Sequence, residues 1–387
     1  MENWEIEELL TPEVRAAIEA NIECKPSEVA LRKGVPSARL VASQVKYLQR
    51  ARRKLPSYYA ARAILPSLAF EQSSSEECAA HKRFEGNLAL DLTCGLGVDS
   101  LYLSRRFARV VAAECNPTLA TITRHNLHLL GADNVELFGG RAEELLEQFE
   151  SVDLIYADPD RRSAEGKKMV CLEECSPNIA ELLPTLRRKA QHLAIKLSPL
   201  FDITEALVRF GEGSDVEVIS LGGEVKEVMV YWSKDATDSR IIATALGVGS
   251  FECAANRPTE RAPQAEFDPT RYHYLVVPDA AIRKAGLVAE WCRSEGLDHY
   301  GAYGFAATRP TATMGHIYSI EVSLPYQPKQ IKKIMGKEKG LELIRHGFPL
   351  SAAAICKALG AKEGAGSKWA FAEINHQKWA IKIRSNE

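Results

Sequence analysis

The chain has 387 residues, a formal net charge of -2 at pH 7 and a hydrophobic content of 46%. This length and composition are typical of a globular protein of two to four domains, whose cores need no disulfide or metal to hold them. The N-terminus lacks the basic and apolar regions of a secretory signal, and no uncharged apolar run reaches the ~18 residues of a membrane span. We therefore expect a cytoplasmic protein with no membrane partner.

The nine cysteines and nine histidines do not indicate a metal site. The cysteines include no C-x-x-C pair, and the histidines include no H-x-H or H-x-x-x-H cluster. Zinc sites are built from such closely spaced pairs. We expect no metal, and we interpret the cysteines as small apolar residues in a reducing compartment.

Residues 1–80 have the apolar spacing of amphipathic helices. Apolar side chains recur about every fourth position over residues 9–22, and a second amphipathic stretch covers residues 42–53. Pro56 and Pro66 interrupt the pattern after it. We predict a helical, basic N-terminal region.

Residues 87–233 alternate short apolar segments with helical ones, which predicts βαβ units and a mostly parallel sheet. One helix is well delimited, because Asn116 can cap it, Pro117 suits its first position and Gly131 follows its end. We predict a doubly wound α/β domain over residues 81–235. The expected strands are 88–92, 110–114, 135–138, 154–157, 193–197, 216–221 and 228–232.

After residue 235 the pattern weakens. Residues 236–270 are interrupted by glycines and prolines, which predicts a strand followed by a linker. Residues 271–325 and 326–387 each have the pattern of a small α+β unit. In the second unit we predict a basic helix over residues 328–335, strands at 341–345, 368–374 and 378–383, and a helix that begins at Ser351.

Positive charge is concentrated in two segments. Residues 29–70 contain nine basic and no acidic residues, and residues 328–387 have a net charge of +7, whereas the rest of the chain has -18. A charge run is usually only a solvated face. A 42-residue window without a carboxylate nevertheless suggests a polyanionic partner, because lysine and arginine that contact phosphates release counterions.

The strongest motif, Asp91-Leu-Thr-Cys-Gly-Leu-Gly-Val-Asp99, lies between an apolar strand and a helix. Glycines at such a turn let a ligand lie against the backbone, and the N–H groups of the helix N-terminus attract an anionic group. A G-x-G pair alone is equally compatible with a structural turn.

Glu114 ends the next strand, where a carboxylate can accept both hydroxyls of an adenosine ribose. The alternative is a surface glutamate at a strand end. A dinucleotide site would need G-x-G-x-x-G, but Ser100 replaces its third glycine. A carboxylate at Asp91 that faces the ligand would suit the ammonium of S-adenosylmethionine (SAM) and repel a pyrophosphate. We therefore expect SAM as the cofactor, bound by Asp91, Thr93, Gly95, Gly97 and Glu114.

A third motif, Asp158-Pro159-Asp160-Arg161-Arg162, follows the fourth strand. In open α/β sheets the carboxyl ends of the strands form the ligand crevice. An Asp-Pro turn there points side-chain and backbone oxygens into the crevice. Such oxygens can orient an amine while the lone pair of the amine attacks a sulfonium methyl. A helix-capping turn is the structural alternative. Lys196, at the end of the fifth strand, either faces the substrate or extends to solvent.

In this order the three motifs resemble those of class I SAM-dependent methyltransferases. Further segments are similar to one bacterial family of methyltransferases that has a THUMP-like C-terminal domain. The resemblance covers nearly the whole chain and implies a seven-stranded catalytic sheet, a linker and small ferredoxin-like domain over 236–325, and a THUMP-like domain over 326–387. The segments that carry it are 70–76, 173–177, 196–199, 222–227 and 345–349.

Two positions depart from related motifs. Amine methyltransferases of the N-P-P-[YF] type have an aromatic residue that stacks on the target base, where this chain has Arg161. Arginine can also stack on a base. The third strand often ends in Gly-Asp-Ala, whose carboxylate accepts the adenine amino group, whereas Arg141 stands here and cannot accept a hydrogen bond.

These observations predict a SAM-dependent methyltransferase that acts on a base nitrogen in ribosomal or transfer RNA. Asp158, which also borders the cofactor, and Pro159 would orient the acceptor, and Arg161 and Arg162 would contact the phosphate or base of the substrate. The basic segments would hold the RNA. Gln72 and Ser74 would close the methionine end of the cofactor site. The alternatives are a non-catalytic RNA-binding protein on the same fold and a small-molecule methyltransferase.

Overall fold

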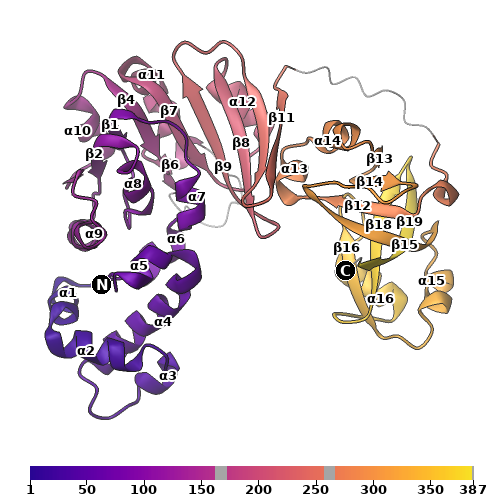
Figure 1. Cartoon of the computed structure of the whole chain (residues 1–387), viewed down its shortest axis with the longest axis horizontal. Helices are drawn as coiled ribbons and strands as arrows, with labels where there is room; N and C mark the ends of the chain where they lie inside the picture. The colour runs from indigo at the N-terminus through magenta and orange to yellow at the C-terminus, as the bar shows by residue number, and fades with distance from the viewer. Residues whose placement is uncertain (162–171, 257–265, 386–387) are drawn as a thin grey trace. The chain divides into compact units, whose positions relative to one another are not determined.

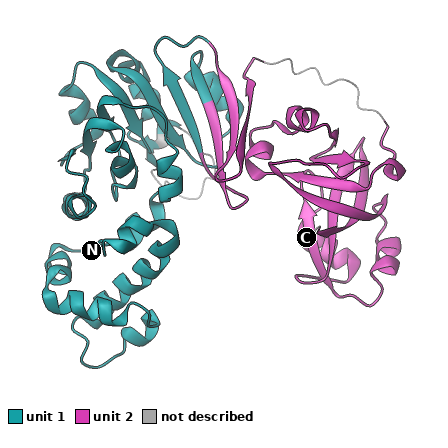
Figure 2. Cartoon of the chain, viewed as in Figure 1, with its two compact units in different colours: residues 1–215, 228–237 teal, residues 216–227, 238–387 magenta. Residues whose placement is uncertain are grey.

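The computed structural model describes residues 1–161, 172–256 and 266–385. Clustering of contacts divides the chain into two compact units (Figure 2). The first consists of Met1–Asp215 and Val228–Thr237, and the second of Val216–Glu227 and Asp238–Glu387. No helix among the described residues is long and apolar enough to cross a bilayer.

The N-terminal region is helical, as predicted, and its longest helix is α4 (Ala38–Lys54). Val41, Val45 and Leu48 repeat at helical spacing on its buried face. The helix stops before Pro56, because a residue that precedes proline is disfavoured in the helical conformation, and Leu55 has left that conformation at φ -137° and ψ 65°. The other helices are α1 (Asn3–Leu10), α2 (Pro12–Asn21), α3 (Pro26–Val29), α5 (Pro56–Ala60), α6 (Ser67–Gln72) and α7 (Glu76–Ala80).

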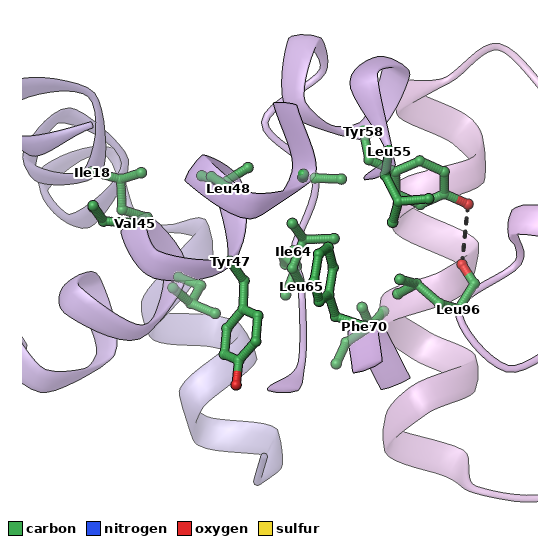
Figure 3. Close-up of a cluster of buried hydrophobic side chains, with 14 of the residues drawn as sticks. Ile18, Val45, Tyr47, Leu48, Leu55, Tyr58, Ile64, Leu65, Phe70 and Leu96 are labelled. Carbon is green, nitrogen blue, oxygen red and sulfur yellow. Dashed lines mark hydrogen bonds between the residues drawn. The ribbon is translucent and has the colours of Figure 1, made fainter. Parts of the chain in front are cut away.

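These helices share a hydrophobic core with the loop that follows the first strand of the α/β domain. Tyr58 and Phe70 from the helices belong to the same buried cluster as Leu96 from that loop (Figure 3). The Tyr58 hydroxyl is fully buried and donates to the carbonyl of Leu96 at 3.2 Å. The boundary expected near residue 80 therefore lies inside one compact unit.

The larger sheet is doubly wound, because its strands run β3-β2-β1 on one side and continue from β1 to β4 and β7 on the other (Figure 1). These neighbours are parallel, and β9 runs antiparallel to β7. All seven predicted strands are present: β1 (Gly86–Asp91), β2 (Phe107–Ala113), β3 (Val135–Phe138), β4 (Val152–Ala157), β7 (Ala190–Leu197), β8 (Ser214–Leu221) and β9 (Glu224–Ser233).

The helices between these strands follow the predicted alternation. The side chain of Asn116 caps α9 by accepting the N–H groups of Thr118 and Leu119 at 3.0 and 3.1 Å. The predicted Asn-Pro start of this helix is thus confirmed. The connecting helices are α8 (Val98–Leu103), α9 (Pro117–Leu129), α10 (Ala142–Glu147), α11 (Ile179–Lys189) and α12 (Ile203–Phe210).

The sheet has nine strands rather than the expected seven. We expected a strand and a linker after residue 235, but β10 (Arg240–Ala245) and β11 (Gly249–Ala254) form an antiparallel hairpin, and β10 pairs in parallel with β8. Gly247, at φ +76°, lies in the turn of that hairpin. We had interpreted the glycines here as part of a linker, but this one connects two paired strands.

The C-terminal part contains an eight-stranded sheet in the order β13-β14-β12-β15-β19-β18-β16-β17. The two α+β units that we expected to meet at residue 326 share this sheet, because β15 pairs with β19. The predicted basic helix is α15, and Ser351 caps α16 as expected. The elements are β12 (Tyr274–Pro278), α13 (Ala280–Lys284), α14 (Val288–Ser294), β13 (Asp298–Tyr300), β14 (Tyr303–Ala306), β15 (Gly315–Pro325), α15 (Pro328–Met335), β16 (Gly340–Arg345), α16 (Ala352–Leu359), β17 (Lys362–Glu363), β18 (Ser367–Ile374) and β19 (Gln377–Ser385).

Candidate active site

Asp91 ends β1 and is completely buried. One carboxylate oxygen accepts the N–H of Thr93 at 2.9 Å, and the other accepts the hydroxyl of Ser100. Burial raises the pKa of Asp91 to about 7, although both hydrogen bonds act to lower it. Both carboxylate oxygens are thus hydrogen-bonded to the loop and to the start of α8, and the contact of Asp91 with the cofactor stays a prediction.

The two glycines of the loop have positive φ angles, +54° at Gly95 and +82° at Gly97. A β-carbon at Gly97 would come within 2.8 Å of the Thr123 side chain, so this glycine is needed for close packing against α9. A β-carbon at Gly95 would meet nothing closer than 3.9 Å. The loop backbone at Gly95 is therefore open to a ligand on the side where a side chain would project.

Glu114 follows β2 and is half-buried beside this loop. Its Oε2 accepts the N–H of Gly95 at 3.0 Å, and its Oε1 accepts the N–H of Asn116 at 2.8 Å. Burial raises the pKa of Glu114, these two bonds oppose the rise, and the nearby carboxylate of Asp160 adds to it. The ends of β1 and β2 thus present a glycine loop and a carboxylate together, as predicted for a nucleoside site.

The Asp-Pro motif after β4 is attached to the same loop. The N–H of Asp158 donates to Oγ1 of Thr93 at 2.6 Å. From the helical region, Nε2 of Gln72 contacts both carboxylate oxygens of Asp160 at 3.3 and 3.4 Å. The structure therefore brings together residues from β1, β2, β4 and α6 that are far apart in the sequence.

Lys196, near the end of β7, contacts this motif directly. Its ammonium lies 2.5 Å from Oδ2 of Asp158 and donates to Oγ of Ser74 at 3.0 Å. The side chain is only 13% exposed, which excludes the alternative that it extends to solvent. The Ser74 hydroxyl in turn donates to Asp99 at 2.9 Å.

Asp99 and Lys82 complete this group of polar residues. The Lys82 ammonium lies 3.7 Å from Asp99, and its side chain is 2% exposed. Burial by itself would raise the pKa of Asp99, but Lys82, Lys196 and the hydrogen bond from Ser74 together lower it. The sequence analysis assigned no role to Asp99, Asp160 or Lys82. Asp99 and Asp160 lie within recognised motifs, whereas nothing in the local sequence distinguishes Lys82.

Arg161 and Arg162 are predicted site residues, whereas Arg141 replaces the carboxylate that often follows the third strand. The backbone of Arg161 belongs to the short strand β5 (Asp160–Arg161) and pairs with Cys175 of β6 (Cys175–Ser176). Arg162 lies outside the described residues. Arg141, which precedes α10, extends toward Glu143 with 63% of its side chain exposed.

The described residues contain no group of three or more His, Cys, Asp or Glu side chains that could hold a metal ion. The polar groups at the carboxyl ends of β1, β2 and β4 instead surround a glycine loop that is partly exposed at Thr93 and Gly95. Such a site suits an organic ligand that carries hydroxyl and ammonium groups.

Known proteins similar to this chain agree with this geometry. A family model described as THUMP domain-like matches residues 315–384. An uncharacterized S-adenosylmethionine-dependent methyltransferase of Mycobacterium tuberculosis is 27% identical over 272 residues, which covers 69% of this chain and 72% of that protein. An uncharacterized RNA methyltransferase of Clostridium acetobutylicum is 29% identical over 94 residues, which covers 23% of this chain and 20% of that protein.

The fold is also found in a crystal structure from Porphyromonas gingivalis W83, of a protein provisionally designated a methyltransferase. That structure has a TM-score of 0.81 at 24% identity and covers 98% of this chain and 99% of its own. The chain is a SAM-dependent methyltransferase whose C-terminal residues match a THUMP-like domain. In this methyltransferase the THUMP-like match begins at residue 315, within β15, rather than at residue 326 as expected.

Proposed function

We propose that this methyltransferase transfers a methyl group from SAM to a base nitrogen of ribosomal or transfer RNA. One observation carries the proposal. The Asp158 backbone is hydrogen-bonded to Thr93 in the loop after β1, which supports a role for the Asp158 turn in binding the acceptor next to a loop that binds the cofactor. Transfer requires the acceptor and the methyl donor to be held together in one geometry.

The residues of the loop fit SAM. The open backbone at Gly95 can lie against the cofactor, and Glu114 offers lone pairs to the ribose hydroxyls. The carboxylates of Asp91, Asp158 and Asp160 favour a ligand with cationic groups. Bound SAM supplies an electrophilic methyl group, and the protein contributes binding, orientation and the exclusion of water.

The acceptor would be held by the Asp158-Pro159 turn. The Asp158 carboxylate, 33% exposed, can accept an N–H of an amino group and direct its lone pair toward the methyl carbon. Pro159 limits the conformations of the turn. Arg161 takes the place of a stacking aromatic residue, and we assign it and Arg162 to the base or phosphate of the substrate.

Basic side chains on the N-terminal helices support an RNA substrate. Arg39, Lys46 and Arg53 follow one another every seven residues, so they lie along one face of α4, and all three are exposed. None of the three forms an ion pair within the part of the chain that the structure describes. We call these residues the α4 stripe. The THUMP-like match, and a relative whose name is RNA methyltransferase, support the same substrate class.

Incubation of the protein with methyl-labelled SAM and total cellular RNA tests the proposal. We expect label in RNA, at a nitrogen-methylated nucleoside after digestion and mass spectrometry, and much slower labelling with Asp158→Ala. RNA binding without label would favour the non-catalytic alternative. Label that appears only with a small-molecule extract would favour a small-molecule acceptor. Label on a ribose oxygen or on a carbon would refute the proposal that a base nitrogen accepts the methyl group.

A further inference from the structure

The ammonium of Lys196 occupies an unusual position for a lysine. It lies near the end of the parallel strand β7, whose neighbour β4 leads directly into Asp158, since Ala157 pairs with Ile195. A mostly buried ammonium is costly unless it is paired and hydrogen-bonded. Here both requirements are met by residues of the candidate active site, Asp158 at 2.5 Å and Ser74 at 3.0 Å.

The contacts of Lys196 continue to the cofactor loop. Ser74 donates to Asp99 at 2.9 Å, and Asp99 lies in the first turn of α8, the helix that follows the glycine loop. Lys82, which follows α7, is buried, and its ammonium lies 3.7 Å from Oδ1 of Asp99. A continuous series of polar contacts thus joins the carboxylate after β4 to the helix that follows the cofactor loop.

We propose that Lys196 is a positioning residue for methyl transfer, and that it holds the Asp158 carboxylate ionised and oriented toward the acceptor. This proposal rests on the proposed function of Asp158. A carboxylate beside an ammonium keeps its charge to lower pH and has a preferred rotamer, so it is ready to accept an N–H of the acceptor. Ser74 orients Lys196 in turn, which gives the segment between α6 and α7 a role in catalysis.

The test is a double-mutant cycle between Lys196→Met and Asp158→Asn. We expect Lys196→Met to lower kcat about 10- to 100-fold, the effect of losing one charge-assisted hydrogen bond. The Kd for SAM should stay within about threefold, because the interaction acts on the acceptor. The double variant should be no slower than Asp158→Asn alone, since Lys196 acts through that carboxylate.

The pH profile separates this role from a merely structural one. In Lys196→Met the acidic limb of the kcat profile should move to higher pH, because a carboxylate without its ammonium partner binds a proton more readily. Lys196→Arg should restore part of the rate and return the limb toward its original place. Lys189→Met is the matched control: this lysine donates to the carbonyl of Phe149 at 2.6 Å, away from the motif residues, and its loss should leave kcat and the profile unchanged.

Additive losses in the cycle, or a Lys196→Met variant with wild-type kcat, would overturn the proposal. If Lys196→Met does not fold, Ser74→Ala carries the test, because it removes the hydroxyl that orients Lys196, and an unchanged kcat and pH profile in that variant would overturn the proposal. The cycle is run on whichever acceptor wild-type protein labels. A label on an atom other than a base nitrogen therefore refutes the proposed substrate while the coupling between Lys196 and Asp158 is still measured.

Discussion

The backbone N–H of Gly95 donates a hydrogen bond to Oε2 of Glu114 at 3.0 Å, which ties the loop after β1 to the end of β2. Each carboxylate oxygen of Glu114 accepts one backbone donor and has further lone pairs for a ligand. The position of the glutamate is thus set before a ligand arrives, so little conformational entropy is lost when it binds one.

Glu114→Ala should therefore weaken SAM binding by about 1.5–3 kcal/mol, the scale of charge-assisted hydrogen bonds. Calorimetric titration with SAM measures the loss. Glu136→Ala is a matched control, because Glu136 pairs with Arg109 on the neighbouring strand and both side chains are at least half exposed. Titration with NAD completes the test: tight binding of NAD without binding of SAM would contradict the assignment of this site.

Asp158→Ala should lower kcat strongly and leave the Kd for SAM nearly unchanged, because its proposed partner is the acceptor. Single-turnover kinetics with the labelled RNA, together with SAM titration, separates the two quantities. Asp133→Ala serves as the control, since that carboxylate is 76% exposed and contacts only His128 in the described structure. An Asp158→Ala variant with wild-type turnover would show that the acceptor is oriented by other groups.

The sequence was most informative where a residue's local neighbours determine its structure. Asn116 and Pro117 define a helix start through short-range geometry, and the strand pattern depends only on apolar periodicity. The pairing of Lys196 with Asp158 could not be predicted, because 38 residues of chain separate them and only the parallel pairing of β4 and β7 makes them neighbours. The complete burial of Asp91 could not be predicted either, since it depends on the adjacent strands.

Asp91 should make the stability of the protein depend on pH. Its pKa is about 7 in the folded chain and has an ordinary value of 3.8, so between these values the folded state binds a proton that the unfolded state lacks. Its contribution to the free energy of unfolding is therefore present at low pH and is lost as pH rises toward 7. Asp91→Asn cannot titrate, so wild type should become less stable relative to Asp91→Asn between pH 4 and 7, and the difference should be constant above that window.

Urea denaturation of both proteins across that range measures the difference, in which the contributions of other groups cancel. The Asn side chain can still accept the N–H of Thr93 and can donate to Ser100, so the variant is expected to fold. A difference that does not change with pH would mean that Asp91 is ionised throughout.

Ion pairs within the N-terminal region determine which arginines can contact RNA. Arg50 pairs with Glu71, and Arg52 pairs with Glu23, so carboxylates outside the basic segment neutralise these two. The sequence of segment 29–70, which contains no carboxylate, does not distinguish these two arginines from Arg53. The α4 stripe of Arg39, Lys46 and Arg53 is the better candidate for a phosphate backbone.

Reversal of the α4 stripe to glutamate should weaken RNA binding across many sequences and reduce its dependence on salt. For single-stranded contacts, log K falls with log salt with a slope of about -0.7 per phosphate neutralised, so the loss of three contacts should reduce the slope by about 2. SAM affinity should persist, because the cofactor site is formed by other residues.

The double variant Arg50→Glu with Arg52→Glu provides the contrast. It breaks the pairs with Glu71 and Glu23, so it should change thermal stability more than the salt slope. Filter binding at several salt concentrations, with thermal unfolding of each variant, shows whether the α4 stripe or the pair of Arg50 and Arg52 contacts the RNA. If the stripe variant keeps the wild-type slope, these side chains only solvate the exposed face of α4, and the RNA is held elsewhere.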